Sequence, residues 1–220
     1  MIVAHIGSWK TGTTAIQHVL RKSRHDLKER GIFFADQRSE YHAEVFRPLY
    51  NRAINHLKKG GSTADKTVKD SIDAFLNFPG CEESNTTIHC WEGFIGHPLN
   101  SSDECLYQAD SVARWISALP EEVTLKGTLS IRNQPDLLEA MYSQEVRKGR
   151  IDYGIDRFLK EKVPGDLAWS RVVDPLEKAL GRHNFRVVPY EIMKKDGSRY
   201  VEEVFWESLP VDSLASLEIK

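Results

Sequence analysis

The sequence has few cysteines, and none of them forms a pair of the kind that binds zinc. Cys81, Cys90 and Cys105 are the only three among 220 residues, and no two are separated by two positions. The eight histidines include no His-Glu-x-x-His pattern. The sequence therefore indicates neither a disulfide framework nor a metal site, and we expect no metal ligands.

A long apolar run and an excess of charge of either sign are also missing. A membrane-spanning helix needs roughly 20 apolar residues, which no segment approaches, and Lys10 and Gly12 interrupt the only candidate for a secretory signal. The 30 Lys and Arg against 32 Asp and Glu give a net charge of −2, unlike a nucleic-acid-binding protein. We expect a cytoplasmic protein with no membrane span and no nucleic-acid partner, in which any anion site is local.

Short apolar runs that suit buried strands alternate with segments of helical periodicity. The expected strands cover 2–6, 32–35, 86–91, 123–131 and 185–190. The expected amphipathic helices cover 15–27, 45–57, 68–76, 112–119, 135–142, two segments within 154–181, and 200–209. This alternation predicts a single domain over 1–220, with a three-layer α/β/α architecture and a central, mostly parallel sheet of about five strands.

The first strand runs into the stretch "HIGSWKTGTTAIQHVL", residues 5–20, which predicts an anion site. A strand, a loop of small residues and a helix leave free backbone N–H groups, and these attract a phosphate-like anion together with the helix dipole. Gly12 allows close approach and Lys10 supplies a positive charge, while hydroxyl donors come from Thr11, Thr13 and Thr14. The alternative is an ordinary turn with Thr13 or Thr14 as N-cap, which leaves the lysine unexplained.

The stretch fits the usual loop of nucleotide triphosphatases poorly. That loop, Gly-x-x-x-x-Gly-Lys-Ser/Thr, has its lysine directly after a glycine, whereas Lys10 precedes Gly12. The stretch instead resembles the 5′-phosphosulfate loop of bacterial-type PAPS-dependent sulfotransferases, which open with His-Ile-Gly…Lys-Thr-Gly-Thr-Thr and a helix. The resemblance includes Gln17 and Leu20, and it implies a P-loop-like phosphosulfate loop, PAPS as cofactor and PAP as product.

A second segment, "TLSIRNQPDLLEAMYSQEVRKG" at residues 128–149, resembles the family's 3′-phosphate element. There an arginine at a strand end and a serine on the next helix bind the 3′-phosphate, which implies this role for Arg132. Ala140 stands where the family has serine, and Ser143, on the same helix face, is the expected substitute. The alternatives are a surface salt bridge of Arg132 with Asp136 or Glu139, and a solvated position for Ser143.

Two residues are candidates for the general base that an acceptor hydroxyl requires. Glu92 in "TIHCWEGFIG" and His42 in "SEYHAEVF" resemble family positions, and we favour them equally. Lys10 would neutralise charge on the leaving 5′-phosphate, by analogy with phosphoryl transfer. Lys10, Glu92 and Arg132 would all follow carboxyl ends of strands, where open α/β sheets bind ligands. The alternatives are a helix cap for His42 and a loop contact for Glu92.

Two further features have both a functional and a structural interpretation. Trp9, inside the loop, covers the cofactor, lines an acceptor pocket or closes the core. The basic residues Arg147, Lys148 and Arg150 either meet the 3′-phosphate or form a solvated face.

The sequence thus predicts a sulfotransferase that moves a sulfuryl group from PAPS to a hydroxyl or amine. The acceptor would be a carbohydrate, a lipid or a small metabolite, and segments 41–77 and 93–108 would help to build its pocket. The alternatives are an ATP-dependent kinase with a divergent P-loop and a non-catalytic adenylate-binding protein. The sequence does not indicate an oligomeric state.

Overall fold

In a computed structural model of the chain, the described residues are 1–96, 108–163 and 168–205. Five strands form one sheet in the order β2-β3-β1-β4-β5, and every neighbouring pair is parallel. The strands are β1 (Ile2–Gly7), β2 (Ile32–Ala35), β3 (Thr86–Cys90), β4 (Leu125–Ile131) and β5 (Phe185–Pro189). The predicted α/β fold with a central parallel sheet is confirmed.

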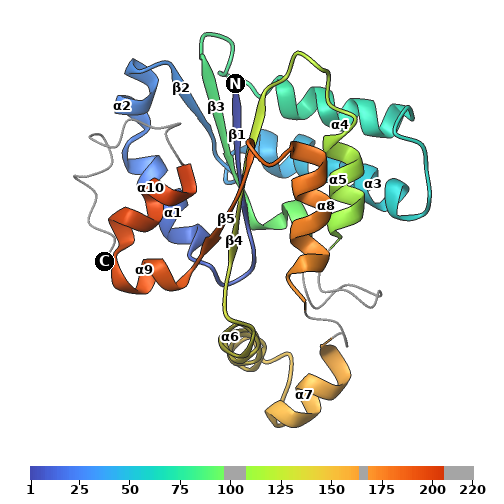
Figure 1. The fold of residues 1–220 in the computed structure, drawn as a ribbon, viewed down its shortest axis with the longest axis vertical. Helices are drawn as coiled ribbons and strands as arrows, with labels where there is room; N and C mark the ends of the chain where they lie inside the picture. Colours follow the sequence, from blue (N-terminus) through green and yellow to red (C-terminus); the bar gives the residue numbers. More distant parts are fainter. Residues whose placement is uncertain (97–107, 164–167, 206–220) are drawn as a thin grey trace.

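Helices cover both faces of the sheet and complete the three layers (Figure 1). One face carries α1 (Thr13–Lys22), α2 (Arg24–Glu29), α9 (Glu191–Lys195) and α10 (Gly197–Phe205). The other carries α3 (Arg47–Lys58), α4 (Lys66–Leu76), α5 (Ala109–Ile116) and α8 (Ser170–Leu180). Val3 of β1 packs into one hydrophobic cluster, and Ala4 packs into the cluster on the opposite face. A strand buried on both faces explains why β1 is apolar apart from the buried His5 and the final Gly7.

Two helices lie beyond the carboxyl ends of the strands, at the bottom of Figure 1. They are α6 (Gln134–Arg147) and α7 (Ile155–Lys162), and a small separate cluster that includes Leu137 and Phe158 joins them. Asn133 caps α6 by accepting a hydrogen bond from the N–H of Asp136, and Pro135 lies in the first turn. Because α6 follows β4 directly, it lies next to the edge of the sheet where a ligand is expected.

The structure corrects several predicted boundaries. The segment predicted as one helix over 15–27 is two, because the chain leaves helical geometry at Ser23 between α1 and α2. A π-helical turn, His42–Phe46, runs directly into α3, and a short 3-10 turn, Glu92–Ile95, follows β3. Helix α9 was not predicted. Residues 206–209 of the last predicted helix lie outside the described residues, as does Cys105. Within the described ranges, no helix combines the length and hydropathy required to cross a bilayer.

Candidate functional site

The loop between β1 and α1 has an unusual backbone. Lys10 has φ 64°, the only positive φ of a non-glycine residue in the described part of the chain, and Gly12 has φ 76°. A left-handed conformation costs a non-glycine residue about 1–2 kcal/mol, and such strain persists mainly at functional sites. Helix α1 begins at Thr13 with Gly12 as its N-cap and no side-chain cap bond. The alternative of an ordinary turn capped by Thr13 or Thr14 is therefore wrong.

Several hydrogen-bond donors of this loop have no partner among the described residues. The backbone N–H groups of Lys10, Gly12, Thr13 and Thr14 make no hydrogen bond, and the buried hydroxyl of Thr13 makes none either. The first N–H groups of a helix have no intrahelical partner, and this set, together with the buried Thr13 hydroxyl, suits an anion. Thr11 differs, since its buried hydroxyl donates to the carbonyl of Ser8 at 2.6 Å. Its side chain therefore supports the loop from within.

A pocket of about 270 Å³, which we call the loop pocket, opens in front of these donors. It brings together six of the predicted site residues from the ends of three strands. Its lining residues are Trp9, Lys10, Gly12, Thr13, Thr14, Glu92, Arg132, Gln144 and Tyr190. Ser143 is not among them: it is exposed on α6, where its carbonyl accepts a hydrogen bond from Arg147. Gln144 is the residue of α6 that lines the loop pocket.

Positive charge is concentrated around Lys10. Its pKa is lowered by partial burial and, secondarily, by the positive charges of Arg147, Lys148 and Arg132. Three cations near a fourth repel one another, and a bound anion would relieve that repulsion. In a chain of net charge −2, this local concentration of positive charge favours an anion at the loop pocket.

Arg132 is held against the loop by several contacts. Its Nη1 donates to the carbonyl of Lys10 at 3.1 Å, and its guanidinium carbon lies 5.1 Å from the ring centroid of Tyr190. Trp169 Nε1 donates to the carbonyl of Arg132 at 3.0 Å. Asp136, a predicted alternative partner, instead pairs with Lys194 at 2.7 Å. The buried Nε of Arg132 has no partner among the described residues, and the residue lines the loop pocket.

A chain of polar groups supports the loop from below. The buried ring of His5 places Nε2 at 2.8 Å from Ser130 Oγ and Nδ1 at 3.1 Å from Cys90 Sγ. Ser130 Oγ lies 2.6 Å from the hydroxyl of Tyr200, which donates to the carbonyl of Thr11 at 2.8 Å. Burial lowers the pKa of His5 to about 3, so its ring is neutral at neutral pH. Sequence reasoning missed Tyr200, because no local pattern connects it to the loop.

Glu92 stands where β3 ends, and Gln17 holds it there. The buried Gln17 Nε2 donates to the carbonyl of Cys90 at 3.0 Å and to Glu92 Oε2 at 3.4 Å. Its Oε1 accepts hydrogen bonds from Gln37 and Arg21. Gln17 thus connects α1 to the end of β3, which makes it a positioning residue for the Glu92 carboxylate. The sequence showed Gln17 only as part of the loop motif and did not predict its contact with Glu92.

A second cavity, of about 600 Å³, adjoins the loop pocket, and we call it the side cavity. Trp9 and Glu92 line both spaces. The other residues that line the side cavity are Gln37, Arg38, His42, Arg47, Asn51, Asn55, Trp91, Gly93, Gly96 and Gln108. Trp9 also packs against the large hydrophobic cluster. It therefore contacts the core as well as the two spaces.

His42 forms part of the wall of the side cavity. Its ring packs edge-on against Trp91 and Phe46, with centroids 5.0 and 5.3 Å away, and neither ring nitrogen has a partner among the described residues. Burial and, secondarily, the positive charge of Arg47 lower the pKa of His42 to about 4, against an opposing effect of Asp36. The imidazole is neutral at neutral pH and does not cap a helix.

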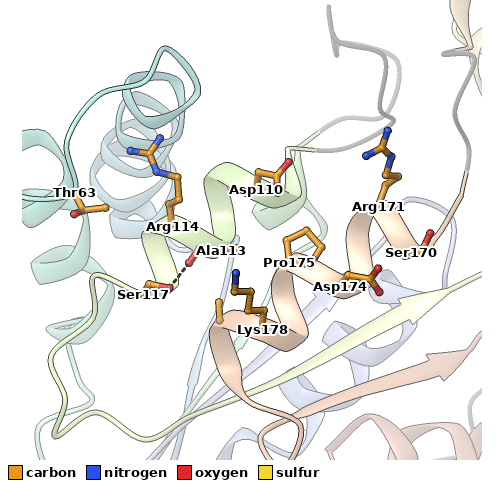
Figure 2. Close-up of a pocket in the computed structure, with 11 residues that line it drawn as sticks. Thr63, Asp110, Ala113, Arg114, Ser117, Ser170, Arg171, Asp174, Pro175 and Lys178 are labelled. Carbon is orange, nitrogen blue, oxygen red and sulfur yellow. Dashed lines mark hydrogen bonds between the residues drawn. The ribbon is translucent and has the colours of Figure 1, made fainter.

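A third cavity, of about 700 Å³, lies between α5 and α8 and contains none of the predicted site residues (Figure 2). Acidic and basic side chains alternate along it, among them Asp110, Asp174 and Lys178. Arg114 is occupied, because it donates to the carbonyls of Leu57 and Gly61.

No protein-family model and no curated protein sequence matches this chain. Solved structures do match its fold. A sulfotransferase from Alicyclobacillus acidocaldarius is 15% identical with a TM-score of 0.58, over 99% of this chain and 85% of that one. A retinol dehydratase in complex with androsterone and the inactive cofactor PAP is 12% identical with a TM-score of 0.46, over 97% and 62% respectively, and is too distant to support an argument. The chain thus has the fold of a solved sulfotransferase.

Proposed function

We propose that this protein is a sulfotransferase that uses PAPS and releases PAP. One observation carries the proposal: unpaired amides, the Thr13 hydroxyl, Lys10 and Arg132 meet in one pocket at the carboxyl edge of the sheet. The likeness of the fold to a solved sulfotransferase supports it. The acceptor group is a hydroxyl or an amine.

The residues of the loop pocket fit the anionic groups of PAPS. The amides of the loop and the Thr13 hydroxyl are donors for the 5′-phosphosulfate. Arg132, which lines the loop pocket, is the donor for the 3′-phosphate, because a guanidinium binds phosphate through several N–H groups. Ser143 is exposed on α6 and outside the loop pocket. We therefore assign the contact with the 3′-phosphate, which the sequence predicted for Ser143, to Gln144.

When bound, PAPS supplies the sulfuryl group, whose bond to the 5′-phosphate is replaced by a bond to the acceptor oxygen or nitrogen. Lys10 places a positive charge where negative charge grows on the leaving phosphate, and the loop amides share that charge. These groups are already in place before reaction, because the strained backbone and the contact of Arg132 with the Lys10 carbonyl hold them. The protein thus acts mainly by positioning and electrostatics.

The base that takes the acceptor proton is best assigned to Glu92. Glu92 lines both the loop pocket and the side cavity, and Gln17 fixes it at their junction. His42 lines only the side cavity. Its ring is neutral at neutral pH, but its lowered pKa makes it a weaker base than an ordinary histidine, so it is the second candidate.

Thermal shifts with PAP, 5′-AMP and Mg-ATP test this function. We expect PAP to raise the melting temperature most, and we expect Arg132→Ala to weaken PAP binding about 10- to 100-fold while it weakens 5′-AMP binding much less. Lys22→Ala is the matched control, since Lys22 is exposed at the far end of α1. Equal losses for PAP and 5′-AMP would contradict the 3′-phosphate role of Arg132, and a preference for Mg-ATP would support a kinase instead.

A further inference from the structure

The side cavity has a chemical character that distinguishes among acceptor classes. None of its described lining residues has an aliphatic side chain. Ligand sites for apolar molecules are mainly lined by hydrophobic side chains, and here only the rings of Trp9, Trp91 and His42 supply an apolar surface. A steroid, a long alkyl chain or a simple phenol would therefore find little complementary surface.

One face of α3 supplies a row of polar groups to this cavity. Arg47, Asn51 and Asn55 follow one another at intervals of four residues, so they lie on the same side of the helix. Within the described ranges, none of these three side chains forms a hydrogen bond or an ion pair. Amide groups donate and accept hydrogen bonds equally, which suits the hydroxyl groups of a polyol.

Two uncompensated positive charges face the same space. The guanidinium groups of Arg38 and Arg47 have no ion-pair partner in the described part of the chain, because the nearby Asp36 is already paired with Arg21 and Arg24 at 3.0 and 3.2 Å. Glu92 is the only acidic residue among the described lining residues, and it lies at the junction with the loop pocket. Apart from Glu92, the described lining residues that carry a full charge are Arg38 and Arg47, so they favour an anionic ligand.

We propose, on the basis of the sulfotransferase function above, that the acceptor is an acidic saccharide: a small polyhydroxylated molecule that carries a carboxylate. Arg38 and Arg47 bind the carboxylate, and Asn51 and Asn55 bind hydroxyl groups. The hydroxyl that reacts lies beside Glu92, which takes its proton as the new bond from oxygen to sulfur forms and PAP leaves. A cavity of about 600 Å³ is within the usual range for ligands of this size.

The test compares three sets of acceptors with radiolabelled PAPS and the whole chain. The acidic set is glucuronic acid and unsulfated hyaluronan tetrasaccharide, the neutral set is cellobiose and maltose, and the apolar set is 2-naphthol and 4-nitrophenol. We expect label in the acidic set, at a rate at least tenfold above the other two. Preferential labelling of the neutral or apolar set would overturn the acidic assignment, and so would the absence of label in all three sets.

Two variants locate the carboxylate. Arg38→Gln and Arg47→Gln should each raise KM for the acidic acceptor about 10- to 100-fold, with the Kd of PAP unchanged. Arg52→Gln is the matched control, because Arg52 is exposed on α3 and lies outside the cavity lining. An unchanged KM in both variants would overturn the proposal. A protein that does not bind PAP at all would refute the proposed sulfotransferase function. PAP binding therefore distinguishes failure of that function from failure of the acidic-acceptor proposal alone.

Discussion

The hydroxyl of Tyr200 in α10 donates a 2.8 Å hydrogen bond to the carbonyl of Thr11 in the loop after β1, across 189 positions of sequence. The same hydroxyl lies 2.6 Å from Ser130 Oγ at the end of β4. One side chain thus connects the two strand ends that carry Lys10 and Arg132. Because the loop contains a strained backbone, such external support is what keeps its amides directed at one pocket.

Removal of this hydroxyl should weaken both the fold and the loop. We expect Tyr200→Phe to lower the free energy of unfolding by about 1–2 kcal/mol, because the Thr11 carbonyl and the Ser130 hydroxyl lose a buried partner. Urea denaturation measures this loss, and titration calorimetry measures the accompanying fall in PAP affinity. Tyr153→Phe is the control, since the Tyr153 hydroxyl has no partner among the described residues. If both variants lose the same stability, the support role of Tyr200 is wrong.

Lys10 combines a functional side chain with an unfavourable backbone conformation. We expect Lys10→Gly to abolish sulfuryl transfer, because the charge on the leaving phosphate is no longer neutralised. Its stability should equal or exceed that of the parent by up to about 1 kcal/mol, since glycine adopts φ 64° without strain.

Lys10→Ala should lose activity without this gain, because alanine keeps the strain. Transfer assays and urea denaturation of both variants give the comparison. Retained transfer in either variant would remove Lys10 from the mechanism.

Glu92 should act on the chemical step rather than on cofactor binding. We expect Glu92→Gln to reduce kcat about 10²- to 10⁴-fold with the Kd of PAP unchanged, and the exposed Glu121→Gln to be neutral. His42→Asn should have a smaller effect on kcat. A larger loss in His42→Asn than in Glu92→Gln would transfer the role of base to His42.

Gln17 should act through Glu92, to which it donates a hydrogen bond. We expect Gln17→Leu to lower kcat more than it changes KM. In the Glu92→Gln background the same substitution should cost little further kcat, because the carboxylate that Gln17 positions is already absent. Fully additive losses in the double variant would mean that Gln17 serves only the packing of α1.

Three buried histidines should make the fold sensitive to acid. Burial lowers the pKa of His5 and His89 to about 3 and that of His42 to about 4, from an ordinary value of 6.5. Below about pH 6.5 the unfolded chain therefore binds protons that the folded chain does not. Stability should be complete above that pH and fall towards pH 4, by about 1.4 kcal/mol per pH unit for each histidine.

Urea denaturation at pH 7, 6 and 5 measures this slope. His42→Asn should reduce the slope by the contribution of one histidine. The same slope in His42→Asn as in the parent chain would show that His42 keeps its ordinary pKa in the folded protein.

Much of the fold could be predicted from local patterns. The five strands are short apolar runs that end at turn residues, and their alternation with amphipathic segments indicates a parallel sheet covered on both faces. Periodicity did not reveal the break at Ser23 or the π-helical turn at His42–Phe46. Both preserve the apolar spacing of their surroundings, and a hydrophobic pattern does not record hydrogen-bond geometry.

The sequence by itself determined the loop after β1, because the order of a strand, small residues, a lysine and a helix fixes where amides and charge stand relative to one another. Only the tertiary structure decided what surrounds that loop. It brought Tyr200 beneath Thr11, placed Gln17 against Glu92, put Gln144 rather than Ser143 in the loop pocket, and joined the side cavity to it. These contacts join residues far apart in the chain, and they depend on how whole helices pack on the sheet, which no short stretch of sequence specifies.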